Sequence, residues 1–217
     1  MKSMLIGLAS AIAIFSSSTT IAFATELTLN VPFKSVTKRL EDSDDKNVQL
    51  PVPGKTQNTQ VWCWAATTAS VVEFINGTPV ADFQLLSNYF SFYAGRRVDC
   101  TREQLCLRPG QDFEIAALYN MNQITAAQVY KAPTFEEIVG WMDRTHMPMI
   151  AKLSNPESQI GHVIIIAGYN SENRALLVID PLADRARWFP FDWVAMNFYG
   201  KGLRWVESFL PYKVTKY

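Results

Sequence analysis

The chain has 217 residues, and its 20 lysines and arginines balance 20 aspartates and glutamates, so the formal net charge is zero. A hydrophobic content of 48% is ordinary for a globular protein and excludes a disordered or acidic tail. Without a basic excess to neutralise phosphates, a nucleic-acid partner is not expected. At about 150 residues per domain, the length predicts one domain with a substantial core.

Residues 1–24 have the pattern of a secretory signal peptide. Lys2 gives a positive start, residues 4–15 are mostly apolar, and an Ala-Phe-Ala pattern ending at Ala24 suits cleavage there. An uncleaved membrane anchor is the alternative, but a bilayer span needs roughly 20 apolar residues and this run is shorter. We therefore expect export to the periplasm or the medium, with no stable membrane insertion after cleavage.

The next segment, residues 25–50, is polar and carries a charged centre at 41–46. It lacks a sustained helical or strand period, so we interpret it as a leader, linker or pro-segment. The folded domain is placed in residues 51–217.

Helices are predicted in the first part of this domain. Residues 63–76 are mostly uncharged and stop at Gly77, a good residue for a helix C-terminus, which indicates a buried helix. Further helices are expected at about 80–91, 111–121 and 134–145, the last opened by a capping box of Thr134 and Glu137.

Strands dominate the second part. Short apolar runs rich in Val, Ile and aromatic residues, divided by turn residues, occur at 149–153, 162–169, 175–180 and 203–209. Helices followed by strands predict an α+β fold, in which an N-terminal helical half packs against a C-terminal antiparallel sheet.

Three cysteines in an exported chain leave one unpaired. Cys100 and Cys106 lie in one polar stretch and can close a small disulfide ring worth about 2 kcal/mol, which leaves Cys63 free. Zinc is the competing use of such residues, but the sequence has no C-x-x-C and two histidines in all. No metal or other cofactor is therefore predicted.

Cys63 stands at the predicted start of the apolar helix. Unsatisfied N–H groups and the helix dipole favour an anion there, and therefore the thiolate, which is the nucleophilic form. A structural interpretation stays open, because free cysteine is among the most buried residue types.

A thiolate nucleophile needs a base, and the chain offers His146 and His162. His146 lies in a turn where a solvated imidazole is expected, whereas His162 opens an apolar strand. If the following hairpin is centred near residue 171, His162 faces Asp180, which could accept a hydrogen bond from the imidazole and fix its tautomer. Both residues also have structural interpretations, since Asp before Pro is a common turn starter.

These points together resemble the papain-like cysteine peptidases. Cys63 lies in a Trp-Cys-Trp-Ala-Ala sequence, and Gln57 stands six residues before it. His162 lies in a distant hydrophobic strand, and Asp180, 18 positions later, precedes a proline. The pattern is most similar to the compact bacterial branch, which includes staphopains, leader-peptide peptidases of bacteriocin exporters and avirulence peptidases. It covers roughly residues 50–195. Plant-type papains have Asn as third member, with glycines and a second cysteine before the nucleophile, and this chain departs from them in both respects.

The resemblance implies a papain-like fold, in which the helix that bears the cysteine is central, and a protein or peptide substrate. By position it implies Cys63 as nucleophile, His162 as general base and acid, Asp180 as the residue that orients the imidazole, and Gln57 as a side-chain oxyanion donor, with Gln60 as its neighbour without a role.

Two alternatives remain beside a cysteine endopeptidase. A cysteine amidase or isopeptidase, including one that cleaves peptidoglycan amides, would use similar chemistry. A catalytically silent papain-like protein could instead bind a partner through aromatic side chains at Trp188, Phe189, Phe191 and Trp193.

Overall fold

The computed structural model describes residues 47–158, 161–183 and 185–213. All of them belong to one of the two units into which the chain divides, Pro32–Tyr217. The predicted signal peptide and residues 25–46 of the predicted leader lie outside the described residues. Within the described residues, no helix is long and apolar enough to cross a bilayer.

Most helices precede most strands along the chain, as predicted, although β1 precedes α1 and β2 precedes α4. The predicted helices all occur, with ends shifted by a few residues, and a turn of 3-10 helix and a short late helix were not predicted. The helical elements are α1 (Cys63–Asn76), α2 (Asp82–Ala94), η2 (Gln104–Cys106), α3 (Asp112–Met121), α4 (Phe135–Thr145) and α5 (Phe191–Met196).

Helix α1 is buried along most of its length although it contains several hydroxyl residues. These hydroxyls donate back to carbonyls one turn earlier: Thr68 Oγ1 to Trp64 O at 2.7 Å, and Ser70 Oγ to Ala66 O at 3.0 Å. Such bonds satisfy polar groups in an apolar setting, where an unpaired group would cost free energy. Helix α1 ends where Gly77 adopts a left-handed conformation with φ of 68°.

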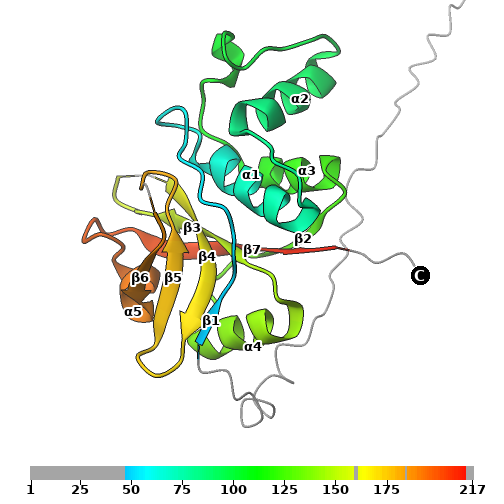
Figure 1. Ribbon diagram of the computed structural model, residues 1–217. Helices are drawn as coiled ribbons and strands as arrows, with labels where there is room; N and C mark the ends of the chain where they lie inside the picture. Colours follow the sequence, from blue (N-terminus) through cyan, green and yellow to red (C-terminus); the bar gives the residue numbers. More distant parts are fainter. Residues whose placement is uncertain (1–46, 159–160, 184, 214–217) are drawn as a thin grey trace, which may run out of the picture. The chain divides into compact units, whose positions relative to one another are not determined.

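All strands within the described residues pair in one antiparallel sheet with the order β2-β7-β3-β4-β5-β6, and β1 also pairs with β4 (Figure 1). The α+β prediction, with helices before an antiparallel sheet, is confirmed. The strands are β1 (Asn47–Gln49), β2 (Thr125–Val129), β3 (Met149–Ser154), β4 (Gly161–Asn170), β5 (Ala175–Ile179), β6 (Arg187–Pro190) and β7 (Arg204–Tyr212).

The middle of strand β4, residues 163–167, is entirely apolar, as expected for a strand whose sheet is covered on both faces. Val163 and Ile165 join the core shared with α1, α2 and α3, whereas Ile164 and Ile166 join the core shared with α4 and α5. Figure 1 shows α1 and α3 on one side of the sheet and α4 at its lower end.

Strand β1 falls in residues assigned from sequence to the leader. It pairs with the far end of β4, where a Cβ on Gly168 would lie 2.3 Å from the carbonyl oxygen of Val48. Glycine is therefore needed at this crossing of two backbones. Three residues are too few to show a period, so no local pattern predicts this strand.

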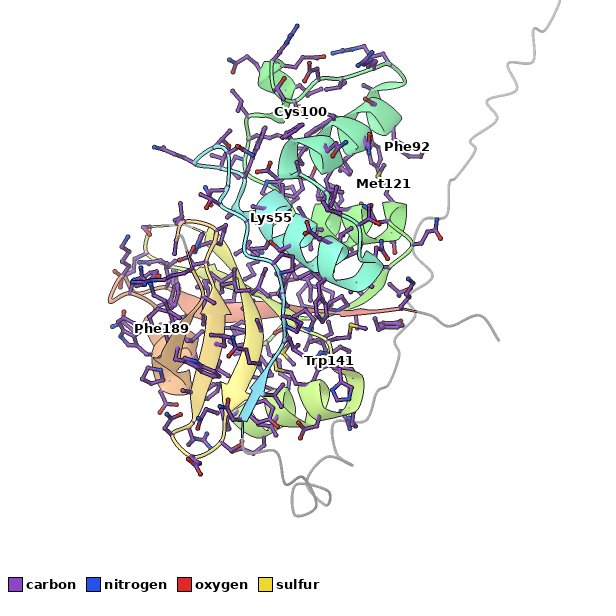
Figure 2. All side chains as sticks on the ribbon, in the orientation of Figure 1. Lys55, Phe92, Cys100, Met121, Trp141 and Phe189 are labelled. Carbon is purple, nitrogen blue, oxygen red and sulfur yellow. A yellow bond between two sulfur atoms is a disulfide. The ribbon has the colours of Figure 1, made fainter. Side chains whose placement is uncertain are left out.

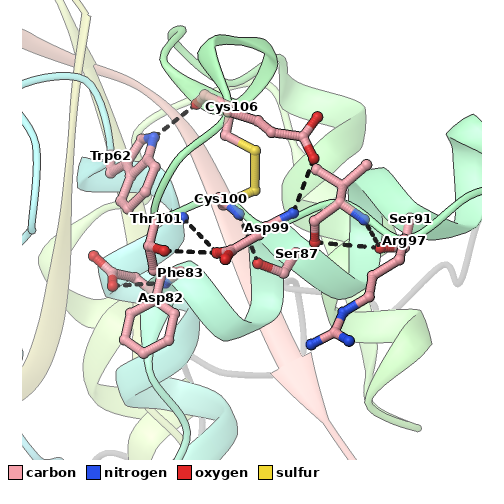
Figure 3. The surroundings of a disulfide bond; sticks show 12 residues. Trp62, Asp82, Phe83, Ser87, Ser91, Arg97, Asp99, Cys100, Thr101 and Cys106 are labelled. Atoms are coloured by element: carbon pink, nitrogen blue, oxygen red, sulfur yellow. Dashed lines mark hydrogen bonds between the residues drawn. A yellow bond between two sulfur atoms is a disulfide. The ribbon is translucent and has the colours of Figure 1, made fainter.

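The loop between α2 and α3 is tied back to the helices (Figure 3). Cys100 and Cys106 are joined there, with Sγ atoms 2.01 Å apart and Cα atoms 5.4 Å apart. The Cys100 N–H donates to the Ser87 hydroxyl at 3.0 Å, and the indole N–H of Trp62 donates to the carbonyl of Cys106 at 2.8 Å. The loop therefore supports the residue that directly precedes α1. The oxidation state of the two thiols in solution stays a prediction.

Candidate active site

Cys63 is the first residue of α1 and carries a free, half-buried thiol. The residues on either side of it are anchored in the core, since Trp62 and Trp64 are each 2% exposed. No side chain caps this end of the helix. The N–H of Ala65 donates to Trp62 O at 3.0 Å, whereas the N–H groups of Cys63 and Trp64 precede the first bond of the helix and can face a negative atom beside Cys63.

His162 and Asp180 form a buried pair. The imidazole Nε2 lies 2.8 Å from Asp180 Oδ1, and the residues are 8% and 3% exposed. The N–H of Leu182 donates to the same Oδ1 at 2.9 Å. Because Nε2 is engaged with the carboxylate, Nδ1 is the ring nitrogen left for another partner.

The pair forms at a different register from the one predicted. The hairpin is centred between Glu172 and Asn173 and not near residue 171, because Asn170 pairs with Ala175. A β-bulge between Ile166 and Gly168 then moves the register back by one residue, so that Ile165 lies opposite Ile179. Asp180, directly after β5, is therefore not opposite His162 in the ladder. Diagonal neighbours on adjacent strands remain within reach of each other's side chains, and this is how the two residues meet.

Charge interactions fix the protonation of the pair. Burial lowers the pKa of His162, but hydrogen bonds and charge interactions with Asp180 and Cys63 outweigh it and raise the pKa to about 9. Burial raises the pKa of the Asp180 carboxyl, but His162 and the N–H of Leu182 outweigh it, so the pKa lies below its usual value. The structure thus brings Cys63, His162 and Asp180 into one interacting group.

Two cavities meet at this group, and Gln60, Cys63, Gly161 and His162 line both. The first cavity continues along Trp64, Pro109, Gly110, Asp112 and Lys152. The second continues along Asp180, Leu182, Arg187, Tyr199 and Lys201. A chain lying through both cavities would pass the Cys63 thiol.

Gln57 is placed beside the group but not in the cavities. Its backbone N–H donates to Pro181 O at 2.9 Å, which links the segment before α1 to the loop after Asp180. Its side-chain Nε2 donates to Thr59 O at 2.6 Å, which leaves its second N–H for another acceptor. Its neighbour Gln60 lines both cavities. The oxyanion role of Gln57 therefore stays a prediction.

His146 has a different task. It is the C-cap of α4, where its backbone adopts φ of 51° and its N–H donates to Met142 O at 2.8 Å. It lines neither cavity at the Cys63 thiol.

Residues 49–206 match the family described as Peptidase_C39 like. The chain belongs to this family. The match confirms the prediction of a papain-like cysteine peptidase. No curated protein matches the chain.

Solved structures similar to this C39-like peptidase share little sequence with it. The peptidase domain of ComA from Streptococcus, a bi-functional ABC transporter of a quorum sensing pathway, has 13% identity and a TM-score of 0.49, over 75% of this chain and 99% of that one. Xylellain, a cysteine protease from Xylella fastidiosa, has 12% identity and a TM-score of 0.44, over 84% of this chain and 90% of that one.

Sequence reasoning missed several residues of the cavity walls in this C39-like peptidase. Gly110 packs so closely on the Trp64 ring that a Cβ would lie 2.3 Å from it. Its position after a proline indicates a turn but does not predict this contact. Lys152 pairs with Asp112 of α3 and, at 3.2 Å, with Glu207 of β7. These contacts join segments that are distant in the sequence, so no local pattern predicts them.

Proposed function

We propose that this chain is an exported cysteine endopeptidase, which hydrolyses peptide bonds through Cys63, His162 and Asp180. The observation that carries the proposal is the single imidazole that interacts with both a carboxylate and a thiol. An imidazole with a pKa of about 9 is protonated at neutral pH and pairs with a thiolate. Membership of the family supports the peptidase activity, and the sequence of residues 1–24 supports export.

The chemistry follows from these groups. The Cys63 thiolate attacks the carbonyl carbon of the scissile bond, and the carbonyl oxygen becomes an oxyanion. The backbone N–H of Cys63 and the free amide N–H of Gln57 are the donors proposed for that oxygen. His162 then gives its proton to the leaving amine, and the C–N bond breaks to leave a thioester on Cys63.

Deacylation runs through the same residues. Neutral His162 takes a proton from water, the hydroxide attacks the thioester carbonyl, and the thiolate leaves with His162 protonated again. Asp180 holds the ring through Nε2 during both steps, so Nδ1 stays directed at the reacting atoms. The second half-reaction regenerates the starting ion pair, and no cofactor enters the balance.

The decisive test replaces the nucleophile. Cys63→Ala should reduce turnover of a peptide library, followed by mass spectrometry, to background, because no other group can form the thioester. The variant should keep its thermal unfolding midpoint within a few degrees, since the half-buried thiol adds little packing. Full turnover by Cys63→Ala would overturn the assignment.

Labelling with iodoacetamide separates this function from a silent binding protein. Wild-type Cys63 should be labelled selectively, and the labelling should depend on pH because His162 carries its positive charge only below about pH 9. A silent scaffold predicts no selective labelling. Cleavage of peptidoglycan amides or isopeptide bonds, with linear peptides left intact, would instead identify an amidase or isopeptidase.

A further inference from the structure

Tyr199 lines the second cavity together with Cys63, His162 and Asp180. It reaches this place from the connection between α5 and β7, far along the chain from the other members of the group. Nothing in the chemistry derived above uses it. Its position nevertheless makes it part of the wall against which Asp180 lies.

The backbone that carries Tyr199 is a tight turn. The N–H of Lys201 donates to Phe198 O at 3.1 Å, and the two central residues, Tyr199 and Gly200, have φ of 53° and 68°. Positive φ at both central positions is the requirement of a type I′ turn, which favours Gly, Asn and Asp. A tyrosine in the first of these positions is strained, and strained residues of this kind gather at functional sites.

The ring of Tyr199 is held in place by other aromatic rings. Its centroid lies 4.3 Å from that of Phe198, 5.6 Å from that of Phe189 and 6.0 Å from that of Trp193. Figure 2 shows Phe189 at the edge of the sheet that is farther from the helical half. This packing fixes the ring, so the direction of its hydroxyl is fixed as well.

The carboxylate of Asp180 has an unused oxygen. Its Oδ1 accepts from Leu182 and contacts His162, but its Oδ2 is buried and has no hydrogen-bond partner among the residues that the structure describes. A buried carboxylate oxygen without a donor costs free energy and allows the carboxylate plane to turn. The Tyr199 hydroxyl interacts with this carboxylate.

The hydroxyl is suited to be the missing donor. Burial and the charge of Asp180 raise the pKa of Tyr199 above its usual value, so the hydroxyl keeps its proton at neutral pH. In free enzymes such bonds are often long and shorten when substrate is bound.

We propose that Tyr199 is a positioning residue, whose hydroxyl donates to Asp180 Oδ2 when substrate fills the second cavity and so holds Oδ1 on His162 Nε2. The inference rests on the proposed function. It adds a fourth residue to the group, which acts on the imidazole through Asp180 and does not touch the reacting atoms.

The test removes the hydroxyl and keeps the ring. Tyr199→Phe should lower kcat about ten-fold, as expected for loss of one hydrogen bond to a charged group, and leave KM within about two-fold. The thermal unfolding midpoint should not fall, because the aromatic packing is retained. The control is Tyr130→Phe, at a tyrosine that is 77% exposed and lines neither cavity, which should leave kcat unchanged.

A double-mutant cycle with Asp180→Asn tests the route of the effect. If Tyr199 acts through Oδ2, an amide in place of that oxygen removes the acceptor, and Tyr199→Phe should then change kcat by less than about two-fold. The same ten-fold loss in both backgrounds would overturn the proposal, because Tyr199 would then act elsewhere. So would a silent Tyr199→Phe, or a loss carried by KM alone. In each of these results turnover that still depends on Cys63 shows that the peptidase assignment stands.

Discussion

The two halves of the molecule hold their parts of the site by different means. The sheet half holds His162 and Asp180 at the ends of neighbouring strands, where ladders of backbone bonds fix their distance. The helical half holds Cys63 at the start of one helix, where two buried tryptophan rings fix its place. The base is therefore positioned by backbone pairing, and the nucleophile by side-chain packing.

Few polar contacts near the site join the halves. Gln57 donates from the segment before α1 to Pro181 after β5, and Lys152 of β3 pairs with Asp112 of α3. A change in the sheet half should thus damage the chemistry with little effect on the thiol's position. A change in the helical half should alter how the carbonyl meets the thiol.

After loss of the thiol itself, the largest effect is expected in the sheet half. His162→Ala should lower kcat by about 10²–10⁴-fold, because both proton transfers pass through this ring. The steady-state rate on the best peptide from the library measures the loss.

The matched control for this prediction is the other histidine, His146, which caps α4 through its backbone. His146→Ala should leave turnover nearly unchanged and cost only stability, since alanine tolerates the positive φ poorly. Loss of activity in His146→Ala, with activity kept in His162→Ala, would show that His146 is the base. The sheet half would then not supply the base.

The next effect belongs to the segment before α1. Gln57→Ala should lower turnover by about 10²–10³-fold, as loss of one oxyanion donor does in a hydrolase, with little change in the iodoacetamide rate, because alkylation forms no oxyanion. The paired measurement is peptide turnover beside alkylation rate.

Gln60→Ala is the control for Gln57, and the structure sharpens the contrast because Gln60 lines both cavities while Gln57 lines neither. If Gln60→Ala alone shows the turnover defect with normal alkylation, Gln60 is the donor and the six-residue spacing misled us.

Local signals in the sequence predicted much of this arrangement. The capping box of α4 forms with Thr134 and Glu137 in their expected roles, because its bonds join residues three apart. The strand at 162–169 is predicted from the apolar run that follows His162, and burial of both its faces explains that run. The grouping of Cys63, His162 and Asp180 was expected from residue types and spacing together.

Features that depend on distant contacts were not predictable. The bulge in β4 shifts the partner of Ile165 and follows no turn residue. Strands β2 and β6 are only half-buried or exposed, so they lack the apolar alternation that marks a strand. Tyr199 occupies a turn position where glycine or asparagine is expected, so neither the turn nor its contact with Asp180 could be read from residue type.

The smallest effect concerns the loop that supports α1. Replacing Cys100 and Cys106 by serine should lower the free energy of unfolding by about 2 kcal/mol, the loop-entropy value for so short a ring. Turnover should fall less than in Gln57→Ala, because the loop reaches Cys63 through the two residues beside it, by the bond from Trp62 to the carbonyl of Cys106 and by the packing of Gly110 on Trp64. Denaturant unfolding and turnover measure the two effects.

Alkylation followed by intact mass supplies the check on this last prediction. Without reductant, the purified exported protein should take one label, on Cys63, and after reduction it should take three, because the oxidised pair is then opened. The serine variant should take a single label under both conditions. Three labels on untreated protein would show that the pair is reduced. The loop would then be held by its hydrogen bonds and ion pairs, among them those of Cys100 with Ser87 and of Trp62 with Cys106, and the serine variant should lose no stability.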